Sequence, residues 1–426
     1  MVLPSSVPPS PSARAKKRWY HSFISTRYPY VSPRLLLRAL RVIVPTAAVA
    51  AILFFFFFEL HIEITPYRRA WVQREISVVP PLSGCFDERN VHPDYNLTHM
   101  LHGPRFTELH AGVPMRLGLD CYDFAGTIQN PFASIRERRT TTFHTYWRTD
   151  LAAFGPRQEW MLKSFLATQP PAHSRLIIWS NGELSTNTVI RRYLDTYPTV
   201  FETRVVDVNG MARGTALEGS KLLDDLFDAR AWVDGDVVRL LALWQEGGAW
   251  IDMDVLLTRD FWPLLEHEYI TQWDCYDKVY QTFNGAFMHF HKRSPYLCEA
   301  FHIMATSDPP RPSSTDWGAL LYLKLWRRLI AAGVRPFQVL PFCLTDGHSC
   351  RLDNRLPDPF TKDPAGGGWT GGLSRAEGGG LDQRLKKVFA VHLHNQWERR
   401  FPEGGWVDRL LLRRYERTLA ERAGTT

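Results

Sequence analysis

The chain has 426 residues, of which 45% are hydrophobic, and its 15 tryptophans and 25 phenylalanines can build a large buried core. The formal charge is +7, but eight of the 51 Lys and Arg residues precede Glu59 and no acid does, so the other 43 balance the 44 acidic residues. The basic excess belongs to an N-terminal tail. This distribution excludes the basic surface that a nucleic-acid-binding domain needs.

The first predicted element is the uncharged segment from Val42 to Phe58, which ends in five consecutive phenylalanines. A stretch of ~17–25 apolar residues spans a bilayer as a helix. The long basic stretch before it favours an uncleaved anchor over a cleaved signal peptide. We predict a disordered cytosolic tail over 1–41 and a transmembrane signal anchor over 42–60. The positive charge on its N-terminal side predicts a type II orientation, with the rest of the chain in a lumen.

All six cysteines follow this anchor, which indicates an oxidising compartment. Cys343 and Cys350 are close enough in sequence to close a small loop, and we predict that they form a disulfide. Asn96 begins an Asn-Leu-Thr glycosylation sequon, which is either used in the lumen or present by chance. Residues 61–138 show weak periodicity and are predicted to form a stem or accessory segment.

Beyond residue 140, short apolar segments alternate with helical ones, which predicts a mostly parallel sheet with helices on its faces. We assign this α/β domain to residues 139–420, with a flexible glycine-rich loop over 363–382. The predicted strands cover 142–147, 175–179, 203–208, 249–257, 285–290 and 388–393. The predicted helices cover 158–168, 188–196, 236–246, 296–304 and 316–332.

Two aspartates follow the predicted helix 236–246, which is apolar around most of its circumference. Gly247 suits the C-terminal cap of that helix, and Asp252 and Asp254 are two residues apart on the next predicted strand, so their side chains share one face. Two neighbouring carboxylates repel each other unless a cation lies near them. Hard oxygen ligands of this kind suit Mn²⁺ or, alternatively, Mg²⁺ together with phosphate oxygens.

Two further clusters accompany these aspartates. Asp236 and Arg239 share a helix face at i, i+3 spacing, either as a structural salt bridge or to bind hydroxyl groups of a polar ligand over the metal. Near the C-terminus, His392 and His394 share one face of a strand. A third metal ligand is expected from His392 or from Asn395, and a histidine packed in the core is the alternative.

Together these clusters resemble glycosyltransferases whose sugar-binding region contains an Asp-x-Asp motif. This family includes fungal α-1,6-mannosyltransferases and α-1,4-galactosyl- and N-acetylglucosaminyltransferases. Asp316-Trp317-Gly318-Ala319 departs from the family pattern, which usually has Gly-Pro at this place. The segments that carry the resemblance are Phe143-His144-Thr145-Tyr146-Trp147, the region from Asp236 to Asp260, Asn284-Gly285-Ala286-Phe287 and Val391-His392-Leu393-His394-Asn395.

The resemblance implies a GT-A-like, Rossmann-like fold and a retaining transfer of a sugar from a nucleotide sugar to a glycan or glycolipid in the Golgi. It implies that Asp252 and Asp254 are catalytic and that Asp252, Asp254 and His392 hold Mn²⁺. The donor is left open between UDP-galactose, UDP-N-acetylglucosamine and GDP-mannose. The alternatives are an inactive glycan-binding relative and a metal-dependent phosphohydrolase. The donor-binding residues that it implies are His144, Trp147, Asp236, Arg239, Asp252 and Asn284.

Overall fold

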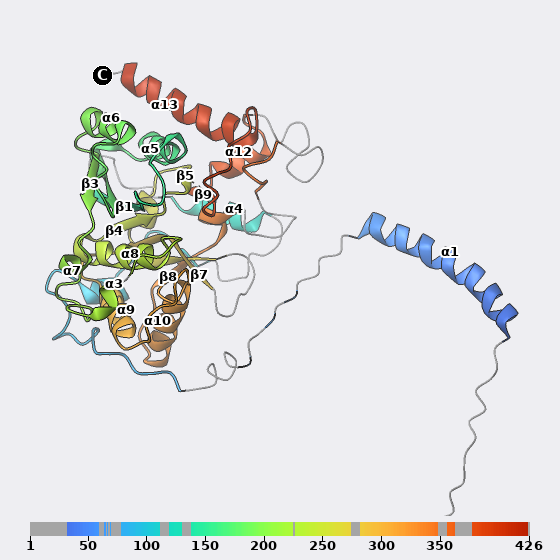
Figure 1. Ribbon diagram of the computed structural model, residues 1–426, viewed down its shortest axis with the longest axis horizontal. Coiled ribbons are helices and arrows are strands. Elements are labelled where there is room, and N and C mark those ends of the chain that lie inside the picture. Colours follow the sequence, from blue (N-terminus) through green and yellow to red (C-terminus); the bar gives the residue numbers. More distant parts are fainter. Residues whose placement is uncertain are drawn as a thin grey trace, which may run out of the picture. The chain divides into compact units, whose positions relative to one another are not determined.

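The computed structural model describes residues 32–58, 64, 66, 69, 78–110, 119–129, 138–224, 226–273, 282–347, 356–362 and 377–424 (Figure 1). The chain divides into two compact units, Met1–Ser77 and Val78–Thr426. The predicted tail up to residue 31 and most of the predicted glycine-rich loop, residues 363–376, lie outside the described residues.

The first unit contributes helix α1, Pro33–Phe57. Its segment Leu37–Phe57 has a mean hydropathy of 2.3 and no buried residue, so it is long and apolar enough to cross a membrane. The helix starts nine residues before the predicted anchor and takes in Arg38 and Arg41. Long basic side chains tolerate such a place, because their stems pack on apolar surroundings while their charges reach water.

The second unit is built on a seven-stranded sheet of order β3-β2-β1-β4-β7-β6-β8. Strand β7 runs antiparallel to both of its neighbours, and all other neighbouring pairs are parallel. The predicted mixed α/β fold with a mostly parallel sheet is therefore confirmed. The strands are β1 Thr141–Trp147, β2 Ser174–Ser180, β3 Phe201–Val205, β4 Gly248–Ile251, β6 Tyr269–Gln272, β7 Phe283–Phe290 and β8 Gln338–Leu340.

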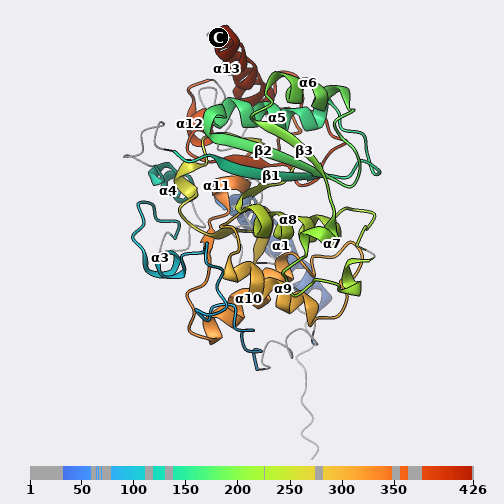
Figure 2. The ribbon, with the colours of Figure 1, turned by 90° about the vertical axis from the view of Figure 1, so that its left-hand side faces the viewer.

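Helices cover both faces of this sheet. Figure 2 shows α5 and α6 on one side of β1–β3, and α7, α8, α9 and α10 on the other. Strand alternation explains the two layers, because Leu176 and Ile178 join one hydrophobic cluster while Ile177 and Trp179 join the other. In chain order, the described α-helices from residue 78 to residue 331 are α3 Leu97–His102, α4 Asp120–Thr127, α5 Pro156–Thr168, α6 Thr188–Thr196, α7 Val208–Met211, α8 Val233–Glu246, α9 Pro295–Ala305 and α10 Ala319–Ala331.

A second, two-stranded sheet pairs β5 (Val255–Leu257) with β9 (Ala390–His392) in antiparallel register. It brings the C-terminal part of the chain next to the segment that follows β4. The remaining α-helices are α11 Cys343–Asp346, α12 Gly380–Leu385 and α13 Arg413–Gly424, preceded by a π-helical turn over Asp408–Leu412. Short 3-10 turns occupy Pro171–His173, Lys221–Leu223 and Trp262–Leu264.

The disulfides differ from the predicted one. Cys343 pairs with Cys121 of α4, at a sequence separation of 222, and Cys350 lies outside the described residues. The prediction of a Cys343–Cys350 bridge is therefore wrong. Sequence proximity favoured the short loop, but the fold brings α4 against α11, and this places the two sulfur atoms together.

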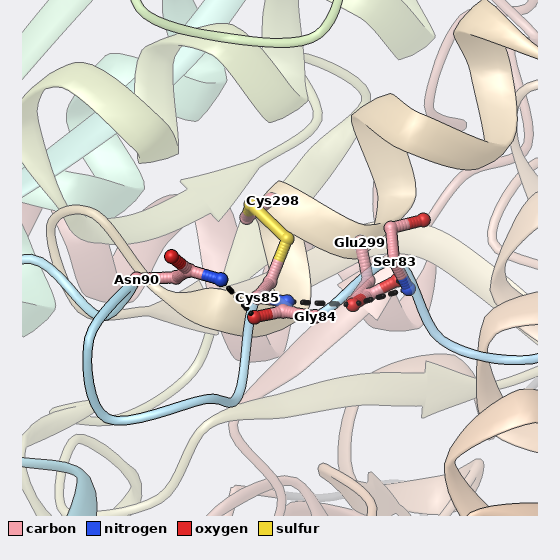
Figure 3. Close-up of a disulfide and its surroundings, with 6 residues drawn as sticks. All are labelled: Ser83, Gly84, Cys85, Asn90, Cys298 and Glu299. Atoms are coloured by element: carbon pink, nitrogen blue, oxygen red, sulfur yellow. Dashed lines mark hydrogen bonds between the residues drawn. A yellow bond between two sulfur atoms is a disulfide. The ribbon is translucent and has the colours of Figure 1, made fainter.

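The second disulfide, Cys85–Cys298, ties the segment before the sheet to α9 (Figure 3). The backbone N–H groups of Ser83 and Cys85 donate to the buried carboxylate of Glu299, at 2.8 and 3.0 Å. Residues 78–110 and 119–129, predicted as a stem, thus belong to the same compact unit as the sheet.

A buried carboxyl in this contact region makes stability depend on pH. Glu268 accepts hydrogen bonds from the hydroxyl of Tyr95 and the backbone N–H of His291, at 2.5 and 3.0 Å. Burial raises its pKa to about 7, although these donors lower it. A raised folded-state pKa gives stability that is fully present below the unfolded value of about 4.3 and is lost as pH rises through 7.

We therefore expect the full chain in detergent to lose about 2–3 kcal/mol of unfolding free energy between pH 5 and pH 8 through Glu268 alone. The variant Glu268→Gln should show a correspondingly smaller loss in denaturant titrations at the two pH values. Equal losses in the two proteins would contradict this assignment.

Candidate active site

The Gly247–Gly248 turn joins α8 to β4 and delivers the chain to the middle of the sheet. Both glycines have positive φ values, 69° and 99°, which other residues rarely adopt. A β-carbon on Gly248 would also overlap the carbonyl oxygen of Thr142, so glycine lets β4 lie directly against β1. The turn places Asp252 immediately after β4, at the carboxyl edge of the parallel strands, where open α/β sheets bind ligands.

Asp252 and Asp254 lie in a turn and not on one continuous strand, which corrects the predicted strand 249–257. The backbone N–H of Asp252 still bonds to Ala286 of β7, whereas the backbone carbonyl of Asp254 accepts from Leu393 next to β9. The chain changes its pairing partner between these two residues. The turn, and not strand alternation, brings the carboxylates together.

Arg239 connects two of the predicted clusters. Its Nη1 donates to Asp236 at 2.5 Å and to the hydroxyl of Tyr322 at 3.3 Å, and its Nη2 donates to Oδ1 of Asp252 at 3.0 Å. The indole N–H of Trp250 donates to the same oxygen, at 2.6 Å. These contacts hold Asp252 by one oxygen. Among the described residues, no hydrogen bond engages its Oδ2.

The buried pair Asp236 and Arg239 depends on two glycines in neighbouring elements. A β-carbon on Gly285 of β7 would overlap Nη1 of Arg239, and one on Gly318 would overlap the carboxylate of Asp236. Burial raises the pKa of Asp236 to about 7, against the lowering effect of Arg239. The pair is therefore built into the fold at the cost of desolvation, which is found at functional sites and also in structural ion pairs.

His392 lies between two buried carboxylates. Its Nε2 is 3.4 Å from Oδ2 of Asp254, and its Nδ1 is 3.4 Å from Oδ2 of Asp346. Asp346 also accepts a hydrogen bond from Nε2 of His394 at 2.8 Å, and the two imidazole rings stack with their centres 4.3 Å apart. Asp346 thus holds Nδ1 of His392 and turns Nε2 towards Asp254.

These charges shift one another strongly. Burial raises the pKa of Asp254, but His392 and the backbone N–H of Asn395 outweigh it and bring the pKa to about 2. Burial lowers the pKa of His392, but Asp254 and Asp346 raise it well above its usual value. The carboxylates of Asp254 and Asp346 therefore stabilise the protonated imidazole of His392, and this proton would leave when a cation takes Nε2 as a ligand.

Ligand atoms of Asp252, Asp254 and His392 all lie within 4.8 Å of one another, so one cation can reach all three. Within the described part of the chain, Oδ1 of Asp254 and Oδ2 of Asp252 accept no hydrogen bond. Two carboxylates and one imidazole form a donor set that suits Mn²⁺. Asn395, the alternative third ligand, contacts Asp254 through its backbone N–H at 2.5 Å.

His144 does not lie where a donor could touch it, contrary to the prediction. It is fully buried in β1, where Trp179 donates to its Nδ1 at 3.1 Å and its Nε2 donates to the carbonyl of Gly247 at 2.9 Å. Burial lowers its pKa to about 4, so the ring is neutral. Its structural task is to support the glycine turn.

The other predicted residues lie as follows. Trp147 ends β1, and its indole N–H bonds to Ala152 at 2.9 Å. Asn284 bonds through Oδ1 to the backbone of Ala286 at 2.8 Å, with Nδ2 3.4 Å from Nδ1 of His392. Asn96 is exposed and caps α3, which leaves glycosylation of the sequon a prediction.

Sequence reasoning missed Asp346, Trp250 as a partner of Asp252, and Tyr322. Asp346 lies in an apolar segment without a motif, and its buried carboxyl reaches His392 only through the fold. The indole of Trp250 carried a weak signal, since it directly precedes the Ile-Asp-Met-Asp segment in sequence. Tyr322 carried none beyond its place on a predicted helix.

No protein-family model matches this sequence, and no curated protein matches it. Among solved structures, it is similar to the PaToxG glycosyltransferase (12% identity, TM-score 0.31, 51% of this chain and 86% of that one). It is also similar to mouse xyloside xylosyltransferase 1 (13% identity, TM-score 0.26, 46% of this chain and 77% of that one). A third similar structure is the WbbM bifunctional glycosyltransferase (13% identity, TM-score 0.22, 34% of this chain and 24% of that one).

Proposed function

We propose that the chain is a metal-dependent glycosyltransferase with a GT-A-like fold, which transfers a sugar from a nucleotide sugar to a glycan or glycolipid. The observation that supports this most is the convergence of Asp252, Asp254 and His392 within 4.8 Å. The buried pair of Asp236 and Arg239 adjoins this cluster through the Arg239–Asp252 bond.

The proposed location is the Golgi membrane, with a type II orientation and a luminal catalytic unit. Helix α1 is apolar enough to serve as the anchor. The disulfides Cys85–Cys298 and Cys121–Cys343 follow this helix in the sequence and suit an oxidising lumen.

The chain's own residues would mainly position and bind the donor. Asp252 and Asp254, the proposed catalytic residues, would hold Mn²⁺ together with His392, with Mg²⁺ as the alternative. The bound ion would supply positive charge to the departing diphosphate as a Lewis acid. Asp236 and Arg239 would bind hydroxyl groups of the donor sugar, with Trp147 and Asn284 as further donor-site residues. Retention of the anomeric configuration is proposed from the family resemblance.

Nucleotide release is the direct test. The full chain in detergent is incubated with Mn²⁺ and, separately, with UDP-galactose, UDP-N-acetylglucosamine and GDP-mannose, with and without EDTA. We expect one donor to release its nucleotide in a metal-dependent way, and the NMR spectrum of the product to show whether the anomeric configuration is retained.

The same assay separates the alternatives. Binding of a glycan without binding or hydrolysis of any donor would indicate an inactive relative. Hydrolysis of p-nitrophenyl phosphate in place of nucleotide sugars would indicate a metal-dependent phosphohydrolase. Either result would overturn the proposal.

A further inference from the structure

A further cationic side chain packs on the loop that follows His392. Arg157 is the second residue of α5, and its guanidinium carbon is 4.3 Å from the ring centre of Phe401. Phe360 and Trp397 enclose it further, at 5.6 and 5.7 Å. Aromatic faces attract a cation, but they leave its N–H groups without acceptors.

The Nε and Nη2 atoms of Arg157 are buried, and neither donates a hydrogen bond within the described chain. Arg399 provides a contrast on the same ring, since its guanidinium carbon is 4.7 Å from the centre of Phe360. Arg399 donates to Gln396 at 2.6 Å and to Asp358 at 3.2 Å. Of these two arginines, only Arg157 has buried N–H groups without an acceptor in the described chain. Leaving a buried donor unpaired costs free energy.

The carboxylate that acts on Arg157 is Asp254. Burial lowers the pKa of Arg157 to about 10, and Asp254 opposes this shift. The guanidinium therefore keeps its charge at neutral pH, close to a proposed metal ligand. Trp397 follows the segment of His392 and Asn395, and its indole packs edge-to-face on Trp147 at 4.9 Å. The aromatic box and the metal-site candidate thus share one loop.

We propose that Arg157 binds a phosphate oxygen of the donor's diphosphate, as a positive centre in addition to the metal ion and Arg239. This inference rests on the proposed function. The Nε and Nη2 groups form one edge of the planar guanidinium, the edge that pairs bidentately with an oxyanion. Both groups are buried, so the side chain must rotate to present this edge to a diphosphate.

A diphosphate suits this arrangement better than a single carboxylate. Trp397 contacts the guanidinium and lies two residues after Asn395, whose backbone N–H bonds to Asp254, so a metal ion held by Asp254 and the guanidinium would be two positive charges near the same loop. A diphosphate has oxygens on two phosphorus atoms to meet both centres, whereas a monocarboxylate would meet one. Arg157 is assigned a binding role here, and proton transfer is not part of it.

The test measures ligand binding to the full chain in detergent by calorimetry, with saturating Mn²⁺ and UDP or GDP as probes. The matching nucleoside and glucuronate serve as phosphate-free probes. In Arg157→Met, which keeps most of the packing volume, we expect the nucleoside diphosphate to bind roughly 10- to 100-fold more weakly, as for a lost charge-assisted pair. Binding of Mn²⁺ alone and of the nucleoside should be unchanged. Arg157→Lys should lie between wild type and Arg157→Met.

Arg399→Met is the matched control and should bind the nucleoside diphosphate like wild type. If Arg157→Met also binds it like wild type, Arg157 has no such role, although the proposed function stands. If the variant loses glucuronate binding instead, the ligand is a carboxylate and the phosphate assignment is wrong. If wild type binds no nucleoside diphosphate with Mn²⁺, the proposed function and this inference both fail.

Discussion

Replacing Asp254 by asparagine is expected to weaken Mn²⁺ binding by more than about 100-fold and to remove detectable sugar transfer. The loss of a partner that only supports a metal ligand costs roughly 10- to 100-fold, so losing a charged ligand should cost more. Asp254 is 2% exposed, and its carboxylate faces His392 and the backbone N–H of Asn395. Among the residues that the structure describes, no other carboxylate contacts both of these groups.

The measurement is Mn²⁺ affinity by calorimetry, followed by the nucleotide-release assay at saturating donor. Asp408→Asn is the matched control, because Asp408 is also paired, to Arg413 at 2.8 Å, but belongs to the C-terminal π-helical turn. It should leave the affinity unchanged. An Asp254→Asn protein that folds, as judged by its melting temperature, and binds Mn²⁺ within a few-fold of wild type would refute the assigned metal site.

Asp346→Asn is expected to weaken Mn²⁺ binding by roughly 10- to 100-fold without removing a metal ligand. Asp346 acts as a positioning residue, since its carboxylate faces Nδ1 of His392 and fixes which ring nitrogen points to Asp254. Asparagine keeps the size of the side chain but loses the charge, so the preferred tautomer of His392 is no longer imposed. Nucleotide release at subsaturating Mn²⁺ should fall, and high Mn²⁺ should restore most of it.

Restoration by excess metal distinguishes this role from a purely structural one, because a misfolded site would not respond.

The disulfide Cys121–Cys343 supplies a second variant, since it ties α4 to the first residue of the helix that ends at Asp346. Replacing both cysteines by serine should weaken Mn²⁺ binding in the same direction. Unchanged affinity in Asp346→Asn would show that His392 needs no such support.

Local sequence patterns determined much of the framework. Helix α6 begins and ends at the predicted residues, Thr188 and Thr196. Its boundaries follow from local signals, namely the amphipathic spacing of its residues and the Asn187 cap that directly precedes it. The parallel strands β1 and β2 were predicted within one residue at each end, since their apolar runs are bounded by clear turn signals. The strands β6 and β8 were missed, because four and three residues are too short for a period to show.

The sequence by itself identified Asp236, Arg239, Asp252, Asp254 and His392 as a candidate group, because each lies in a short local pattern. It could not show that the predicted strand is interrupted between β4 and β5, that His144 supports the glycine turn, or that Asp346 holds His392. Only the tertiary structure decided these points. Strand pairing, burial and the disulfides at separations of 213 and 222 residues depend on contacts between distant segments, which no local periodicity records.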